Sequence, residues 1–143
     1  MEKTKKELSA GSIVFKKKGK KIFWLVVKPE ENDEWCFPKS HLKGGENSVM
    51  AAKRGAKEKA GIETELLEKI GIDNYSLYQD KKRISRTVIF YLIEYLQDSE
   101  ESFGKKTEKV IWLPLKKALE KLALVKERKF LRQAADLLGK IEK

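Results

Sequence analysis

The chain has 143 residues, 41% of them hydrophobic, which suits a single well-buried domain over residues 1–143 and is too short for two. The net charge of +10 favours polyanionic partners such as nucleotides, polyphosphate, RNA or acidic membranes, although a solvated surface is the favoured interpretation for most of the lysines. One cysteine, Cys36, excludes an internal disulfide and a thiolate metal site, so a reducing cytoplasm is expected. Because the sequence contains no signal peptide and no apolar run of roughly 20 residues, we expect no membrane partner.

A β-hairpin is predicted near the start of the chain. The first eight residues are polar and are expected to be mobile. Two runs of β-branched and aromatic residues, 12–15 and 22–27, flank a basic turn that contains Gly19. The second run is apolar on both faces, which is typical of a central strand. An acidic loop and a short extended segment, 35–37, follow.

The stretch 37–62 predicts a loop that leads into a helix. A Gly-Gly pair interrupts any periodic pattern, Asn47 or Ser48 can cap the helix, and Gly61 can end it. The apolar face is formed by residues three or four apart, namely Val49, Ala52, Ala56 and Ala60. Such a junction directs unpaired backbone N–H groups and the positive end of the helix dipole at the loop. The loop also carries lysines, so the junction favours anions.

The rest of the chain predicts further strands and two closing helices. The expected elements are extended segments at 63–70 and 72–78, a basic turn at 80–83, strands at 86–93 and 110–113, and helices at 115–122 and 130–141. The last helix has an apolar stripe formed by Phe130, Ala134, Leu137, Leu138 and Ile141. This order predicts an α+β fold in which a mixed sheet lies between helices, with Trp24, Phe90 and Leu137 largely buried.

Residues 40–62 resemble the Nudix box, in which glycine, five residues, glutamate and seven residues precede R-E-U-x-E-E-x-G-U, where U is aliphatic. The matching positions are Ser40, which replaces the first glycine, and Glu46, Arg54, Glu58, Gly61 and Ile62. The segments W-C-F-P-K-S-H at 35–41 and W-L-P-L at 112–115 resemble the diadenosine-polyphosphate hydrolase branch of that family. The resemblance extends from about Ala10 to about Leu122 and implies the Nudix α/β/α sandwich.

The box departs from the family at its carboxylates. In the family, three glutamates of the motif share one helical face and gather divalent cations beside the substrate's phosphates. Here the segment is R-G-A-K-E-K, so Gly55 removes one carboxylate, Lys59 reverses another, and only Glu58 remains. The formal charge of that face changes from minus three to zero. An ammonium at Lys59 can take the electrostatic position of the metal and pair directly with phosphate.

The resemblance also assigns roles to individual residues. Glu58, Glu46 and Arg54 match catalytic positions, although a structural ion pair is the favoured interpretation for Glu46 with Arg54. Glu58 is equally well a ligand of Mg²⁺ or Mn²⁺ or an i,i+4 partner of Arg54. Glu108 is a second candidate metal ligand, with a solvated loop residue as the favoured alternative. The candidate substrate-binding residues are Lys39, which matches the lysine of the lead-in segment, and, by their charge alone, Lys59 and Arg83. For Arg83, in the basic turn, a solvated position is the favoured interpretation.

These features predict a cytoplasmic protein that acts on or binds a nucleoside diphosphate or polyphosphate derivative. We expect metal-dependent hydrolysis to be weakened or lost because the box has lost carboxylates. Two alternatives stay open. One is an active hydrolase of mononucleoside or dinucleoside polyphosphates that uses Mg²⁺ or Mn²⁺. The other is a non-catalytic module that binds a nucleotide, another phosphate compound or RNA.

Overall fold

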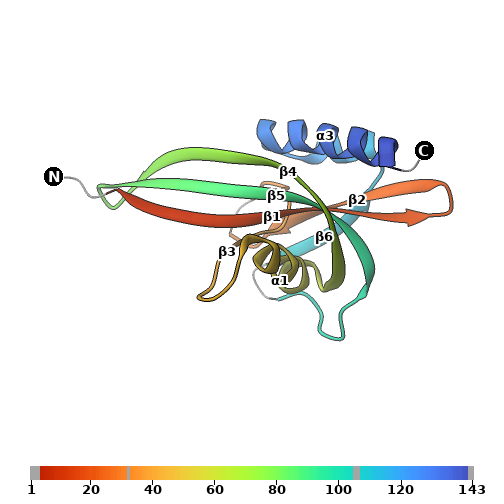
Figure 1. Ribbon diagram of the computed structural model, residues 1–143, viewed down its shortest axis with the longest axis horizontal. Helices are drawn as coiled ribbons and strands as arrows, with labels where there is room; N and C mark the ends of the chain where they lie inside the picture. Colours follow the sequence, from red (N-terminus) through yellow and green to blue (C-terminus); the bar gives the residue numbers. More distant parts are fainter. Residues whose placement is uncertain (1–3, 32, 105–106, 142–143) are drawn as a thin grey trace.

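The computed structural model describes residues 4–31, 33–104 and 107–141, which form a mixed sheet between helices (Figure 1). The strands are β1 (Lys5–Lys18), β2 (Lys21–Pro29), β3 (Lys39–His41), β4 (Ile62–Gln79), β5 (Lys82–Asp98) and β6 (Thr107–Leu113). The helices are α1 (Ser48–Ala60), α2 (Leu115–Lys121) and α3 (Val125–Ile141). The strand order is β4-β5-β1-β2-β6, with β3 paired to β1 off this path. Strands β1 and β5 are parallel, and the other pairs are antiparallel.

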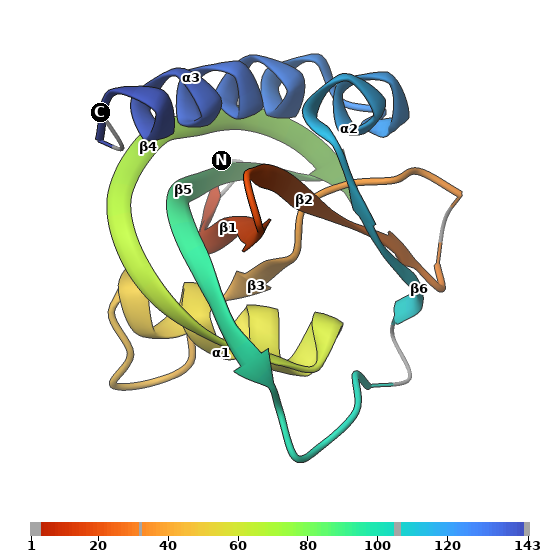
Figure 2. The same ribbon diagram turned by 90° about the vertical axis from the view of Figure 1, so that its right-hand side faces the viewer.

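The helices cover opposite faces of the sheet, with α1 on one side and α3 on the other (Figures 1 and 2). Helix α1 packs through small side chains, since Ala51, Ala52 and Ala56 are all fully buried. Helix α3 buries larger ones, and Leu131 and Leu138 belong to the same core cluster as Trp24 and Phe90. In the described parts of the chain, no helix has both the length and the apolar character needed to cross a membrane.

Phe90 anchors the core on the α3 side of the sheet. Its ring lies against Gly11 of the neighbouring strand, where an added Cβ would stand 2.4 Å from the ring, so glycine is required at this close approach. The rings of Phe37 and Phe130 lie with centroids 6.3 and 5.1 Å away. The burial predicted for Trp24 and Phe90 is confirmed, with exposed fractions of 2% and 1%.

Three expectations about local structure are wrong. Residues 5–8, for which no regular structure was expected, begin β1, because the parallel pairing with β5 continues down to Lys5. Segments 63–70 and 72–78 are extended as predicted, but they are not separate. They form one long strand, β4, whose register shifts against β5 let it stay paired while it curves (Figure 2). Leu137 is only half-buried, because Leu131 and Leu138 point into the core instead. The expectations for residues 1–3 and for the side chain of Ile141 lie outside the described residues.

Candidate functional site

The loop and helix predicted at the box are present, with both predicted caps. Asn47 caps α1, and its Oδ1 accepts from the N–H of Met50 at 2.9 Å. Gly61 ends the helix in the left-handed conformation, with φ of 69°, and donates to the carbonyl of Lys57. Ser12 of β1 donates its hydroxyl to the carbonyl of Ala52 at 2.8 Å, which fixes the helix on the sheet.

Glu46, Arg54 and Glu58, the residues expected at catalytic positions, lie together. Arg54 donates to both carboxylate oxygens of Glu46, with Nε–Oε2 and Nη2–Oε1 distances of 2.7 and 3.0 Å. It also reaches Glu58 at 3.1 Å and the carbonyl of His41 at 2.7 Å. The Arg54 guanidinium, with the N–H of Lys43, lowers the pKa of Glu46 to about 2. The cluster therefore ties the loop to the helix as a charged network.

Glu58 has cations on both sides of its half-exposed carboxylate. Arg54 lies at one oxygen, and the ammonium of Lys43 lies 3.6 Å from the other. In the described parts of the chain, no group of three or more His, Cys, Asp or Glu side chains is placed to hold a metal ion. With Glu46 held by Arg54 and glycine at position 55, the donor set on α1 does not fit a resident divalent ion, which needs several oxygen ligands.

Lys59 and Lys39 are brought together where the last turn of α1 meets β3. The ammonium of Lys59 donates to the backbone carbonyl of Lys39. The ammonium of Lys39 in turn pairs with Glu127, whose other oxygen accepts from the N–H of Phe37 at 3.0 Å. Burial raises the pKa of Glu127, against the opposing effect of Lys39. This network joins the box loop to the start of α3.

Glu127 was missed by the sequence analysis, although a signal was present. It precedes Phe130 by three residues and Leu131 by four, so it lies on the apolar stripe of α3 and is only 2% exposed. A carboxylate at a core position of an amphipathic helix indicates a buried partner. Its partner, Lys39, lies 88 residues earlier in the chain.

A cavity of about 800 Å³ adjoins these residues. Its lining includes cations, carboxylates and aromatic rings. The cations are Lys39, Lys59, Arg86 and Lys126, the carboxylates are Glu31, Glu34, Asp73 and Glu127, and the rings are those of Phe37, Tyr75 and Phe90. Arg86 pairs with Glu7 at 2.7 Å and lies 6.0 Å from the ring centre of Tyr75. Cys36 also lines the cavity, and burial raises the pKa of its thiol. A hollow with cations and aromatic rings suits a ligand that has both phosphate groups and a flat base.

Two of the expected site residues lie elsewhere. Arg83 is exposed near the start of β5 and does not line the cavity. Glu108 pairs with Lys28 at 3.5 Å and does not line the cavity either. The structure thus brings together Lys39 and Lys59 at the cavity, and joins Glu46, Arg54 and Glu58 in the neighbouring network.

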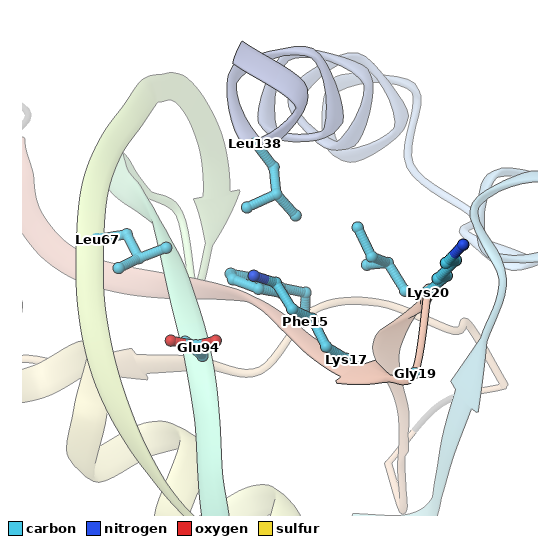
Figure 3. A pocket seen from close by; sticks show the side chains of 8 residues that line it. Phe15, Lys17, Gly19, Lys20, Leu67, Glu94 and Leu138 are labelled. Atoms are coloured by element: carbon cyan, nitrogen blue, oxygen red, sulfur yellow. The ribbon is translucent and has the colours of Figure 1, made fainter. Parts of the chain in front are cut away.

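A second cavity, of about 530 Å³, lies at the far end of the β1–β2 hairpin (Figure 3). Phe15 and Leu138 face it together with Leu67 of β4, while Lys20 and Glu94 stand at its sides. None of the box residues lines it. The candidate site is therefore the larger cavity beside α1.

Comparison with known proteins agrees with this geometry. The family model of the NUDIX domain matches residues 5–134. An 8-oxo-(d)GTP phosphatase of Mycolicibacterium smegmatis is 29% identical over 108 residues, which are 76% of this chain and 32% of that protein. The MutT4 protein of Mycobacterium tuberculosis is also 29% identical over 108 residues, which are 44% of its length. The chain therefore spans less than half the length of these curated relatives.

Solved structures with the same fold include an Ap4A hydrolase of C. elegans, in a binary complex. It has a TM-score of 0.72 and 21% identity, and the match covers 93% of this chain and 98% of that one. The NUDIX domain of Shewanella oneidensis NrtR, complexed with ADP ribose, has a TM-score of 0.71 and 15% identity, covering 92% of this chain and 87% of that one. The chain belongs to the Nudix family, whose hydrolases generally use divalent metals.

Proposed function

We propose that this protein binds a nucleoside diphosphate or polyphosphate derivative in the cavity beside α1, and that it hydrolyses that ligand slowly or not at all. The phosphates would lie against Lys39 and Lys59, and the base among the aromatic residues. The observation that carries the proposal is the position of these two lysines on the wall of a cavity of about 800 Å³. This volume is within the range of small-molecule sites.

The chemistry of the cavity lining supports the class of ligand. Ammonium groups bind phosphate oxygens by charge-assisted hydrogen bonds, and an aromatic ring such as Tyr75 can stack on any base. The relatives act on or bind related compounds, as their names say: one is an 8-oxo-(d)GTP phosphatase, one an Ap4A hydrolase, and one a complex with ADP ribose. These compounds share phosphates linked to a nucleoside.

The charges on α1 support slow or absent hydrolysis. Metal-assisted attack on a phosphate needs carboxylates that hold the ion and position water. Gly55 supplies none, Lys59 is a cation, and Glu58 is engaged by Arg54 at 3.1 Å. A divalent ion loses water ligands when it binds to a protein and needs other oxygen ligands in their place. One half-exposed carboxylate among cations supplies too few of them.

An active hydrolase is the second candidate, because one feature favours it. Glu46, Arg54 and Glu58 form the connected network that the matching box positions imply. In this candidate, substrate phosphates would complete the ligand shell of an ion held through Glu58.

Binding and turnover are to be measured together on the same panel. Isothermal titration with ATP, 8-oxo-dGTP, ADP-ribose, diadenosine tetraphosphate and a short RNA gives the class of ligand. Chromatography of the same mixtures with Mg²⁺ or Mn²⁺ gives the rate of product formation. We expect one nucleotide to bind at one site per chain, with product formation close to the rate without protein. Rapid metal-dependent turnover would support the active hydrolase, and RNA as the sole ligand would support an RNA-binding module.

Two tyrosines on β4 provide a matched pair for locating the ligand. Tyr75 lines the cavity, whereas Tyr78 is 69% exposed and does not. If the base stacks on Tyr75, the Tyr75→Ala variant weakens nucleotide binding by roughly tenfold, since stacking contributes about 1–3 kcal/mol per base. The Tyr78→Ala variant should bind like wild type. Equal effects of the two changes would place the ligand outside this cavity.

A further inference from the structure

The Lys59 side chain reaches from helix α1 to strand β3. Its ammonium donates to the carbonyl of Lys39, and both residues line the large cavity. The box alignment puts Lys59 at the position of a family glutamate. A cation is therefore built into the position where the family pattern has a carboxylate.

The surroundings of Lys59 disfavour a divalent ion at the same place. The remaining carboxylate, Glu58, already faces Arg54 at 3.1 Å and Lys43 at 3.6 Å. Lys39 adds another ammonium at the cavity wall, paired with Glu127. A divalent cation at Glu58 would meet the charges of Arg54 and Lys43 with one half-exposed carboxylate to offset them. The carboxylates that line the cavity are Glu31, Glu34, Asp73 and Glu127, and none of them lies on the box helix.

Phosphate groups require compensation of their negative charge when they enter a cavity. In a metal-dependent site, the ion supplies that charge and bridges phosphate oxygens. An ammonium carries three N–H donors, so a group that holds one carbonyl can also donate to a phosphate oxygen. Its contact with the Lys39 carbonyl positions it before any ligand arrives, which lowers the entropic cost of binding.

We propose that Lys59 replaces the metal ion, so that the phosphates of the ligand bind without any divalent cation. The inference rests on the proposed function, because it concerns the same ligand in the same cavity. It has a further consequence for solution behaviour. Mg²⁺ complexes the phosphates of free nucleotides, so adding it should leave binding unchanged or weaken it.

The test measures nucleotide binding by isothermal titration in EDTA and in Mg²⁺, with ATP and ADP-ribose as probes. Wild type should bind in EDTA at least as tightly as in Mg²⁺. The Lys59→Met variant should bind roughly ten- to a hundredfold more weakly, as expected for the loss of a hydrogen bond to a charged group. The Lys59→Arg variant should retain most of the affinity. The matched control is Lys57→Met, because Lys57 lies on the same helix, pairs with Glu63 and does not line the cavity.

A charge reversal gives a second test that does not depend on a loss of binding alone. The Lys59→Glu variant adds a carboxylate beside Glu58, so it should bind weakly in EDTA and regain affinity with Mn²⁺. Thermal melting of every variant shows whether the contact with the Lys39 carbonyl is needed for stability.

The outcomes separate this inference from the proposed function. If wild type binds nucleotide only with Mg²⁺ and Lys59→Met binds equally well, the inference is overturned while the proposed function stands. If Lys59→Glu binds as wild type does in EDTA, the inference is overturned as well. If no nucleotide binds in either condition, the proposed function fails and this inference fails with it.

Discussion

The hydroxyl oxygen of Ser40 occupies the space beside Gly55 of helix α1. A Cβ added at Gly55 would stand 2.5 Å from Ser40 Oγ and 3.1 Å from Ser40 Cβ. The box pattern has glycine where Ser40 stands and glutamate where Gly55 stands. The two departures therefore compensate each other in volume. The larger residue of the pair stands on the helix in the box pattern and on the strand in this chain.

This relationship predicts energetic coupling between the two positions. Replacing a helical glycine by alanine favours the helix by up to about 1 kcal/mol, whereas overpacking a buried site costs about 1–3 kcal/mol. Gly55→Ala should thus destabilise wild type and stabilise the Ser40→Gly background. Urea denaturation of the four proteins gives the coupling free energy, expected to be about 1 kcal/mol or more. Independent effects of the two changes would contradict this packing.

The same contact alters how the missing carboxylates can be restored. Gly55→Glu with Lys59→Glu returns three carboxylates to the face of Glu58, but the new side chain at position 55 meets Ser40. The triple variant with Ser40→Gly should therefore show higher Mg²⁺- or Mn²⁺-dependent hydrolysis of nucleoside polyphosphates than the double variant. Phosphate release from a nucleotide panel measures this. A fast wild-type enzyme that neither variant exceeds would contradict the idea of a degraded metal site.

Local signals were sufficient for most of the fold. Asn47, Gly61 and Gly19 act on the backbone within a few residues, so the bounds of α1 and the turn of the first hairpin follow from the sequence, whereas the start of β1 at Lys5 does not. The packing of Ser40 against Gly55 could not be predicted, because it depends on how closely β3 approaches the helix. The pair of Lys39 with Glu127 joins positions 88 residues apart, and no local pattern selects that partner.

The buried pair of Lys39 with Glu127 predicts that removing the cation alone destabilises the fold more than removing both charges. Lys39→Met leaves a buried carboxylate without its cation, which should destabilise the fold by about 2 kcal/mol or more. The double variant with Glu127→Gln should be more stable than Lys39→Met alone, because no buried charge is left uncompensated. Urea denaturation of both variants measures the difference. Lys129→Met, at an exposed position of α3, is the matched control.

A pH series adds a second readout for this pair. Burial raises the pKa of Glu127, and removing Lys39 should raise it further. A carboxyl group with a raised pKa in the folded state favours folding at acidic pH, and this advantage is lost as the pH rises through that value. The deficit of Lys39→Met should therefore shrink below neutral pH. A deficit that is constant across the pH range would show that lost packing, and not the buried charge, causes it.

The opposite pH dependence is expected for the network of Glu46 with Arg54. The pKa of Glu46 is lowered from 4.5 to about 2 in the folded protein by the guanidinium of Arg54 and the N–H of Lys43. As the pH falls, the unfolded chain takes up this proton first, so the stabilisation is complete above pH 4.5 and is lost between pH 4.5 and about 2.

The Glu46→Gln variant removes this dependence, so its free energy of unfolding should fall less steeply than that of wild type over this range. Glu65→Gln, at an exposed position of β4, makes the same neutral change away from Arg54 and should follow the wild-type curve. Urea denaturation at closely spaced pH values measures all three proteins, and identical curves for wild type and Glu46→Gln would show that Arg54 does not stabilise the fold through this carboxylate.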